Sequence, residues 1–325
     1  MKPKALITKN LLSEAMEYLK EHIHYKVART DRYPTKEEII SGIKDKHGII
    51  SLLVDNIDRD IIEAASDLKI IANCAAGYNN IDVEYATTKG IYVTNTPGVL
   101  TDTTADLTWA LLLSVARRIP QADQFTRNKK YKNWELDLFL GKDLGGKQLG
   151  IIGMGRIGKA VALRARSFKL KTVYTDPKKL TPDEEKKYKA NYLPLEKLLE
   201  SSDFVTIHTV LTKDTHHLIS RKNIHLIKKQ AILVNVSRGP VVEEKALAEA
   251  LENGDLWGAG LDVYENEPEI ENKLLSLDNV VLLPHIGSAS YGTRIKMSMM
   301  AAKNLVQVLT GKPPINPVNL EEVKR

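Results

Sequence analysis

Three side chains that could act together in acid–base chemistry on an anion each follow an apolar, strand-like run. Arg238 follows AILVNVS, Glu267 follows GAGLDVYEN, and His285 follows NVVLLP. Ligands of open parallel sheets bind beyond the carboxyl ends of the strands, so we expect these side chains to converge. A guanidinium clamps a carboxylate, an imidazole exchanges a proton near neutral pH, and a neighbouring carboxylate orients that ring and favours its charged form. The set therefore predicts hydride transfer at the carbonyl carbon of a 2-oxo acid.

Each of these residues also has an ordinary structural interpretation. A histidine after a proline is often structural, an arginine at a strand end often forms a surface ion pair, and Glu267 alone is typical of a solvated turn. Only their shared placement beside a nucleotide-binding turn favours the catalytic interpretation.

That turn lies in LGIIGMGRIGKAVALRARS, as Gly153-x-Gly155-x-x-Gly158 between an apolar strand and an apolar-periodic helix. In such a turn the first glycine permits the tight bend, the second allows a pyrophosphate to approach, and the third lets helix and strand pack closely. Asp176 ends the next strand, where a carboxylate accepts hydrogen bonds from an adenosine ribose and repels a 2′-phosphate. We therefore expect NAD(H) as the preferred cofactor, with NADP(H) as the alternative because Lys178 and Lys179 follow closely.

Composition narrows the class of protein. The 325 residues include 43% hydrophobic and 27% charged side chains, with a net charge of +6. No basic run interleaved with aromatics predicts nucleic-acid binding, and no apolar run is long enough to cross a membrane. Cys74 is the single cysteine, which fits a reducing, cytoplasmic compartment. Neither His22-x-His24 nor His216-His217 has helical metal-ligand spacing, so we expect no metal.

The chain alternates strand-like and helix-like runs twice, which predicts parallel sheets covered on both faces. The first set occupies residues 1–99. A long helical segment over 101–127, broken near Pro120, and a loop over 128–146 precede the second set. The expected strands are 4–8, 25–29, 48–54, 68–75, 90–95, 147–155, 171–175, 203–209, 231–237, 256–263 and 279–285, and the expected helices outside the long segment include 11–21, 35–43, 59–67, 83–89 and 292–311.

Taken together, NCAAGYNNID, TPGVLTDTTADLTWALLLSVARR, GIIGMGRIG, VNVSRGPVV, GAGLDVYENEP and LLPHIGSAS resemble the D-isomer-specific 2-hydroxyacid dehydrogenase family, in its glyoxylate/hydroxypyruvate reductase branch. The resemblance covers nearly the whole chain. It implies an α/β protein with two doubly wound parallel-sheet domains, in which a Rossmann dinucleotide-binding domain (100–286) is inserted in a flavodoxin-like substrate domain (1–99 plus 287–325).

The resemblance also assigns residues. It implies that Arg238, Glu267 and His285 are catalytic. It implies that Ala76 and Gly77 offer backbone N–H groups to the substrate carboxylate, and that Leu53 lines the substrate pocket together with Arg238 and His285. The positions expected to touch the dinucleotide, including the glycine turn and its acid, are Thr104, Gly153, Gly155, Arg156, Ile157, Gly158, Asp176, Val236, Asp262 and Gly287, with Asp262 at the nicotinamide carboxamide.

Two segments depart from the family or leave its pattern open. Val210 replaces a proline that is usual in the family, in a loop over the adenosine. The loop before the glycine turn, in which some reductases of this branch carry an aromatic residue that enters the partner's active site, offers Trp134, Leu138 and Phe139.

The segment 101–140 is expected to form a homodimer. Its residues Trp109, Leu111, Leu112, Leu113 and Val115 surround the helix with apolar side chains. Such a helix belongs either to the core of its own chain or to a subunit interface, and we favour the interface.

The expected activity is the reduction of small 2-oxo acids, glyoxylate to glycolate and hydroxypyruvate to D-glycerate. D-3-phosphoglycerate and D-lactate dehydrogenase activities are the nearer alternatives. A non-catalytic, NADH-sensing protein similar to the C-terminal-binding corepressors is the alternative from another class.

Overall fold

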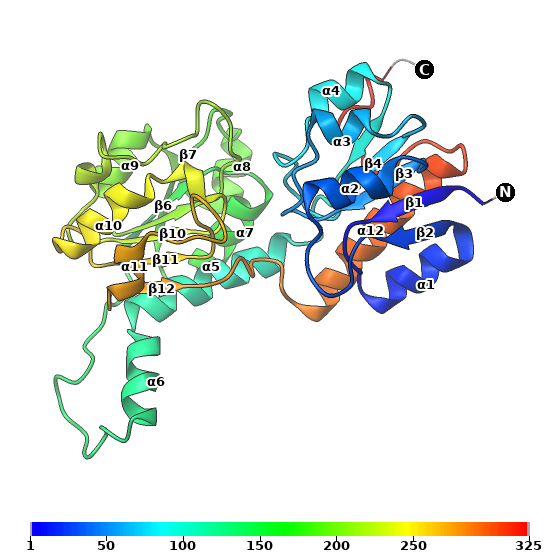
Figure 1. The fold of residues 1–325 in the computed structure, drawn as a ribbon. Helices are drawn as coiled ribbons and strands as arrows, with labels where there is room; N and C mark the ends of the chain where they lie inside the picture. Colours follow the sequence, from blue (N-terminus) through cyan, green and yellow to red (C-terminus); the bar gives the residue numbers. More distant parts are fainter. Residues whose placement is uncertain (1, 324–325) are drawn as a thin grey trace. The chain divides into compact units, whose positions relative to one another are not determined.

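The computed structural model describes residues 2–323, so the outermost residues of the expected substrate domain lie outside the described part. The chain divides into two compact units (Figure 1). Unit 1 comprises the chain up to Leu100 and from Ser288 onward, and unit 2 comprises Thr101–Gly287. Each unit contains one sheet in which every pairing of strands is parallel. The predicted α/β class with two parallel sheets is confirmed.

The sheet of unit 1 has the strand order β2-β1-β3-β4-β5, which is the flavodoxin-like order. Helix α12 (Tyr291–Leu309), from the end of the chain, packs on β3 and β4. The strands are β1 (Lys4–Ile7), β2 (His24–Val27), β3 (Gly48–Ser51), β4 (Ile70–Asn73) and β5 (Tyr92–Thr94), and the other helices are α1 (Ser13–His22), α2 (Lys36–Ile43), α3 (Arg59–Glu63) and α4 (Val83–Thr88).

The sheet of unit 2 has the order β12-β11-β10-β9-β6-β7-β8, the dinucleotide-binding order with an added edge strand. Its strands are β6 (Gln148–Ile152), β7 (Lys171–Thr175), β8 (Ala190–Tyr192), β9 (Phe204–Ile207), β10 (Ile232–Asn235), β11 (Gly258–Leu261) and β12 (Val280–Leu282). Its helices are α5 (Thr101–Ala116), α6 (Ile119–Arg127), α7 (Arg156–Ala165), α8 (Pro182–Tyr188), α9 (Leu195–Ser201), α10 (Glu244–Glu252) and α11 (Asn272–Ser276), with 3-10 turns η1 (Ile224–Leu226) and η2 (Gly239–Val241).

Strand alternation builds a separate apolar core on each face of this sheet. On β9, Phe204 packs with the residues of α5 and α7, whereas Val205 and Ile207 pack with those of α9 and α10. A parallel strand covered on both faces needs apolar residues at successive positions, and all four residues of β9 are buried. The two cores hold the carboxyl strand ends in fixed register.

The long predicted helix breaks near Pro120, as expected. Helix α5 ends at Ala116, and Arg118, which precedes α6, takes a left-handed conformation with φ of 51°. Pro120 lies in the first turn of α6, where a proline costs no intrahelical hydrogen bond. In one continuous helix the N–H of residue 120 would donate to the carbonyl of Ala116, which a proline cannot do, so α5 ends at Ala116 and the chain turns before Pro120.

Four of the five apolar residues named on α5 lie in the core of their own unit instead of at the surface, and Leu113 is half-buried. Trp109, Leu111, Leu112 and Val115 are each at most 5% exposed within their own chain. Trp109 stacks on Phe168 with ring centroids 4.5 Å apart. These side chains belong to the core of unit 2, the alternative that the sequence left open.

Exposed apolar side chains gather instead on the segment after α5. Figure 1 shows α6 and the following loop extending away from the sheet of unit 2. No residue of α6 is buried. The exposed fractions reach 76% for Trp134 and 80% for Leu136, and Leu140, Tyr131 and Ile119 are at least half exposed. We call residues 119–140 the arm.

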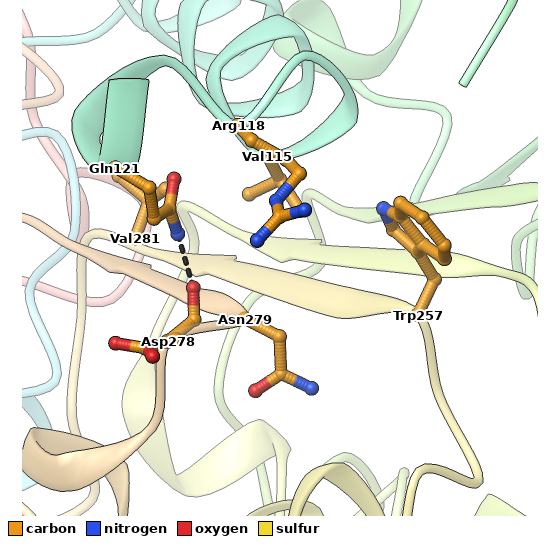
Figure 2. A pocket seen from close by; sticks show the side chains of 7 residues that line it. All are labelled: Val115, Arg118, Gln121, Trp257, Asp278, Asn279 and Val281. Carbon is orange, nitrogen blue, oxygen red and sulfur yellow. Dashed lines mark hydrogen bonds between the residues drawn. The ribbon is translucent and has the colours of Figure 1, made fainter. Parts of the chain in front are cut away.

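A cavity of about 210 Å³ lies where the arm begins (Figure 2). Gln121 donates a hydrogen bond from its amide to the carbonyl of Asp278, which ties the start of α6 to the segment before β12. The lining combines apolar and polar side chains and includes none of the predicted catalytic residues; it consists of Val115, Arg118, Gln121, Trp257, Asp278, Asn279 and Val281.

No helix among residues 2–323 is long and apolar enough to cross a bilayer.

Candidate active site

Arg238 is held by a tight turn three residues beyond β10. The amide of Asn235 donates to the carbonyl of Arg238 at 3.0 Å, and Nη1 of Arg238 donates to the carbonyl of Ser237 at 2.7 Å. A Cβ on Gly239 would lie 1.8 Å from the carbonyl oxygen of Tyr264. Only glycine permits that approach, which brings the arginine against the segment that carries Glu267.

The guanidinium of Arg238 sits in a largely enclosed environment. Burial lowers its pKa, and the negative charge of Glu267 acts in the opposite direction. A guanidinium stays charged throughout the accessible pH range. A cation that has lost much of its water in this way attracts a carboxylate more strongly than an exposed one does.

Glu267 and His285 form a hydrogen-bonded pair. Oε2 of Glu267 lies 2.8 Å from Nδ1 of His285, and Oε1 accepts the N–H of Tyr264 at 3.1 Å. Burial alone would raise the pKa of Glu267, but the hydrogen bond and charge of His285, the Tyr264 N–H and Arg238 together lower it. An ionised carboxylate only accepts hydrogen bonds, so Nδ1 carries the hydrogen and Nε2 is left for a substrate.

The turn around His285 is fixed from behind by Asp262. The carboxylate of Asp262 accepts the N–H of Ile286 and the N–H of Gly287, both at 2.7 Å. Oγ1 of Thr104 donates to the carbonyl of Gly287 at 3.1 Å. His285 itself has a φ of 54°, a left-handed conformation that is uncommon for histidine and persists only where neighbours impose it. Asp262, at 1% exposure, therefore anchors the backbone that presents the imidazole.

The glycine turn leaves open space in front of a helix start at the same sheet edge. Gly153 has a φ of 93°, and a Cβ on Gly158 would lie 2.1 Å from the carbonyl oxygen of Gly153. A Cβ on Gly155 would meet no atom within 4 Å, so the space beside it is open. No side chain caps α7 at that point, which leaves its first N–H groups and partial positive charge for an anion.

Asp176 closes the turn from the β7 side. Its carboxylate accepts the N–H of Met154 at 2.8 Å and the N–H of Lys178 at 2.9 Å. Each carboxylate oxygen has a further lone pair, so the group can still accept a ribose hydroxyl. The open space beside Gly155, the uncapped helix and the fixed acid all fit the diphosphate and ribose of a dinucleotide.

The other positions that were expected to touch the cofactor differ in exposure. Arg156 and Ile157 begin α7, the former exposed and the latter half-buried. Val236 follows β10 and is 7% exposed, within the core on the α5 side of the sheet.

His208, which the sequence did not single out, follows β9 at this edge. Among the described residues both of its ring nitrogens are buried without a hydrogen-bond partner. Burial lowers its pKa to about 3, so the ring is neutral. A Cβ on Gly153 would lie 2.9 Å from the carbonyl oxygen of His208. The sequence could have indicated His208, because it directly follows an apolar, strand-like run of the same sheet.

In unit 1 the three expected substrate contacts lie on two loops that side-chain amides join. Leu53 follows β3, and Ala76 and Gly77 follow β4. Asn80 donates to the carbonyl of Leu52 at 3.1 Å and accepts a hydrogen bond from Asn73 at 3.0 Å. The two loops are therefore braced as one surface.

In the turn after β4, the backbone carbonyls accept hydrogen bonds, whereas two backbone N–H groups have no acceptor among residues 2–323. The carbonyls of Ala75, Ala76 and Gly77 accept from Thr96 N–H at 2.9 Å, the Asn95 amide at 2.6 Å and the Asn73 amide at 2.9 Å. Within residues 2–323, the N–H groups of Ala76 and Gly77 donate to no partner. Neighbouring unsatisfied N–H groups make an anion-binding concavity.

A dinucleotide-binding sheet with an acid-paired histidine and a half-buried arginine defines a class of nicotinamide-dependent dehydrogenases. Residues 109–287 match the model of the D-isomer specific 2-hydroxyacid dehydrogenase NAD-binding domain. The chain belongs to this family.

Within the family, the chain is similar to glyoxylate reductases. It is 48% identical to the glyoxylate reductase of Korarchaeum cryptofilum, over all of this chain and 98% of that protein. A solved Thermus thermophilus protein superposes with a TM-score of 0.90 at 43% identity, covering 97% of this chain and 99% of that one. The NADPH-dependent glyoxylate/hydroxypyruvate reductase of Sinorhizobium meliloti, solved with NADP and malonate, gives a TM-score of 0.85 at 32% identity, covering 100% and 99%.

Proposed function

We propose that this chain reduces glyoxylate to glycolate and hydroxypyruvate to D-glycerate. The observation that carries the proposal is the hydrogen bond between His285 and Glu267, 2.8 Å long, in the unit that also carries Arg238 and the glycine turn. The similarity to glyoxylate reductases supports the choice of substrates. Unit 2 is the nucleotide-binding domain in this proposal, and unit 1 is the substrate domain.

The residues divide the chemistry among them. Arg238 binds the substrate carboxylate and polarises the adjacent carbonyl. The bound dinucleotide supplies a hydride to the carbonyl carbon. His285 donates the proton from Nε2 to the carbonyl oxygen, which completes the alcohol, and Glu267 holds the ring and balances its charge. Ala76 and Gly77 donate their N–H groups to the same carboxylate, and Leu53 limits the size of the substrate.

We infer that NADH is the preferred cofactor and that NADPH is accepted less well. The carboxylate of Asp176 would repel a 2′-phosphate, although Lys178 is adjacent. In Asp176→Ala we expect a lower preference for NADH, measured as a smaller ratio of kcat/KM with NADH to kcat/KM with NADPH. A ratio that stays at its wild-type value would show that other residues set the preference.

We also propose that the chain is a homodimer and that the arm carries the interface. The arm exposes Trp134, Leu136 and Leu140, each more than 60%. Large exposed apolar side chains on one projecting segment are typical of subunit contacts. We place the enzyme in the cytoplasm, where a reducing environment keeps the buried Cys74 thiol free.

The test is the oxidation of NADH with a panel of 2-oxo acids. Glyoxylate and hydroxypyruvate are expected to give higher kcat/KM values than pyruvate or 3-phosphohydroxypyruvate. A preference for pyruvate would favour a D-lactate dehydrogenase, and a preference for the phosphorylated acid would favour the phosphoglycerate enzyme. Tight NADH binding without turnover at millimolar glyoxylate would favour a corepressor-like binding protein.

A further inference from the structure

Unit 1 contains a cation that the reaction described above does not use. Arg294 lies in the first turn of α12. Its Nε is buried and has no hydrogen-bond partner, and among residues 2–323 its side chain forms no ion pair. A buried guanidinium nitrogen without an acceptor is costly to retain, so it calls for a partner that the chain itself does not supply.

The guanidinium lies near the carboxyl end of β4. Helix α12 packs on β4, and the Cys74 side chain belongs to the core on that face. Burial raises the pKa of the Cys74 thiol to about 11, while a hydrogen bond from Ser298 and the charge of Arg294 act to lower it. Ser298 is one helical turn after Arg294, so both residues face the same strand end.

The turn that follows Cys74 is the one whose amides are unused. Ala75 accepts the N–H of Thr96 through its carbonyl, and the carbonyls of Ala76 and Gly77 are bonded to asparagine amides. Oγ1 of Thr96 is itself buried and without a partner among the described residues. The ends of β4 and β5 therefore carry two N–H groups and a hydroxyl without partners among the described residues, and the charge of Arg294 acts on Cys74 at the start of the same turn.

We propose that Arg294 is a substrate-binding residue, which holds the substrate carboxylate together with the N–H groups of Ala76 and Gly77. This inference rests on the proposed function, because the anion it assigns is the carboxylate of a small 2-oxo acid. Arg294 then supplies the positive charge for this anion within unit 1. Affinity for small carboxylates depends on Arg294, whereas affinity for the dinucleotide does not.

The experiment compares Arg294→Gln with Arg294→Lys and with Lys296→Gln, which removes an exposed positive charge from the same helix. The readouts are KM for glyoxylate, the inhibition constant of oxalate as a carboxylate that is not reduced, and the dissociation constant of NADH. Arg294→Gln is expected to raise KM and the oxalate constant by about tenfold or more. Arg294→Lys is expected to fall between it and the wild type, and Lys296→Gln to stay within about twofold of the wild type. The NADH constant is expected to stay unchanged.

A KM and an oxalate constant that remain within about twofold of wild type in Arg294→Gln would overturn the proposal. An equal loss of NADH affinity would also overturn it, since that indicates a structural role. If the glutamine variant does not fold, Arg294→Lys tests the proposal instead, because lysine lacks the Nε–H donor. Oxalate binding by this variant that is as tight as in the wild type refutes the assignment. Failure of the wild type to reduce glyoxylate would refute the proposed function instead, and oxalate titration by calorimetry still tests Arg294.

Discussion

Unit 2 contains two histidine–glutamate pairs that look alike. His285 and Glu267 are 2.8 Å apart, and His217 and Glu265 are 2.6 Å apart. The side chains are 25% and 29% exposed in the first pair, and 33% and 25% in the second. Both histidines have a left-handed backbone, with φ of 54° and 51°. Distance, burial and backbone strain therefore do not separate a catalytic pair from a structural one.

The ring nitrogen that each glutamate takes differs between the pairs. Glu267 binds Nδ1 of His285, which leaves Nε2 at the tip of the ring for a substrate. Glu265 binds Nε2 of His217, so the tip of that ring is already occupied.

The surroundings also differ. Glu265 accepts the N–H of Glu244 at 3.0 Å, at the start of α10, and its own N–H donates to Glu244 at 2.7 Å. The His217 pair thus ties a loop to a helix terminus. The His285 pair instead has the charge of Arg238 acting on Glu267, and Asp262 fixing the backbone after the histidine. A histidine–glutamate pair indicates chemistry only through what surrounds it.

The strongest test of this comparison is His285→Asn. Asparagine tolerates the left-handed backbone, so the variant removes the imidazole with little added strain. We expect kcat to fall about 100- to 10 000-fold, because the proton donor is lost, while the dissociation constant of NADH stays near its wild-type value. Steady-state kinetics and fluorescence titration check the two parts. A kcat within tenfold of wild type would remove His285 from the mechanism.

Arg238→Ala tests whether the arginine near Glu267, which has no counterpart described beside the His217 pair, contributes to catalysis. Removing a half-buried cation that binds the substrate carboxylate should cost about 3–5 kcal/mol of transition-state stabilisation, seen as a higher KM and a lower kcat. Arg221→Ala is the control, because Arg221 is 60% exposed and pairs with Glu249. Equal values of kcat/KM in the two variants would contradict the role of Arg238 as a clamp.

Glu267→Gln tests whether the negative charge of Glu267 contributes to the free energy of unfolding. The pKa of Glu267 is lowered in the folded state, so its carboxylate stabilises the protein above the pKa of the unfolded chain. This contribution is lost as the pH falls through the folded-state pKa. The variant should therefore be less stable than wild type at pH 7, by on the order of 1 kcal/mol, and the difference should shrink in acid below about pH 4. Urea unfolding at several pH values measures it, with Glu265→Gln as the matched variant. A difference that is constant from pH 7 to pH 3 would be inconsistent with a lowered pKa.

Much of the fold could be predicted because parallel strands buried on both faces are continuous apolar runs. Strand β8, absent from our predicted strands, has only three residues at the sheet edge, ANY, and shows no such run. Residues 48–54 look like one strand, yet β3 ends at Ser51, because the N–H of Leu52 donates to the side chain of Asp55 at 2.7 Å. Strand ends set by side-chain hydrogen bonds do not appear in a hydrophobic pattern.

The placement of the candidate residues at one sheet edge could be predicted, but the contacts that support them could not. Arg238 and His285 follow apolar strands, and parallel strands bring their carboxyl ends to one edge. The contact of Gly239 with the Tyr264 carbonyl and the two backbone hydrogen bonds of Asp262 join segments whose spacing in the sequence carries no such information. Arg294 lies on an amphipathic helix, where an arginine is typical of a solvated face.

The smallest expected effect belongs to His217→Asn, the matched variant of the second pair. Asparagine again tolerates the left-handed backbone, and the variant deletes the ring that bonds to Glu265. We expect kcat and KM for glyoxylate to stay within about twofold of wild type, because no reacting group is lost. Stability should fall by about 0.5–1.5 kcal/mol, since one partly exposed hydrogen bond disappears. Urea unfolding and steady-state kinetics on the same preparation separate the two effects. A large fall in kcat with unchanged stability would reverse the comparison, because the structural pair would then be taking part in the reaction.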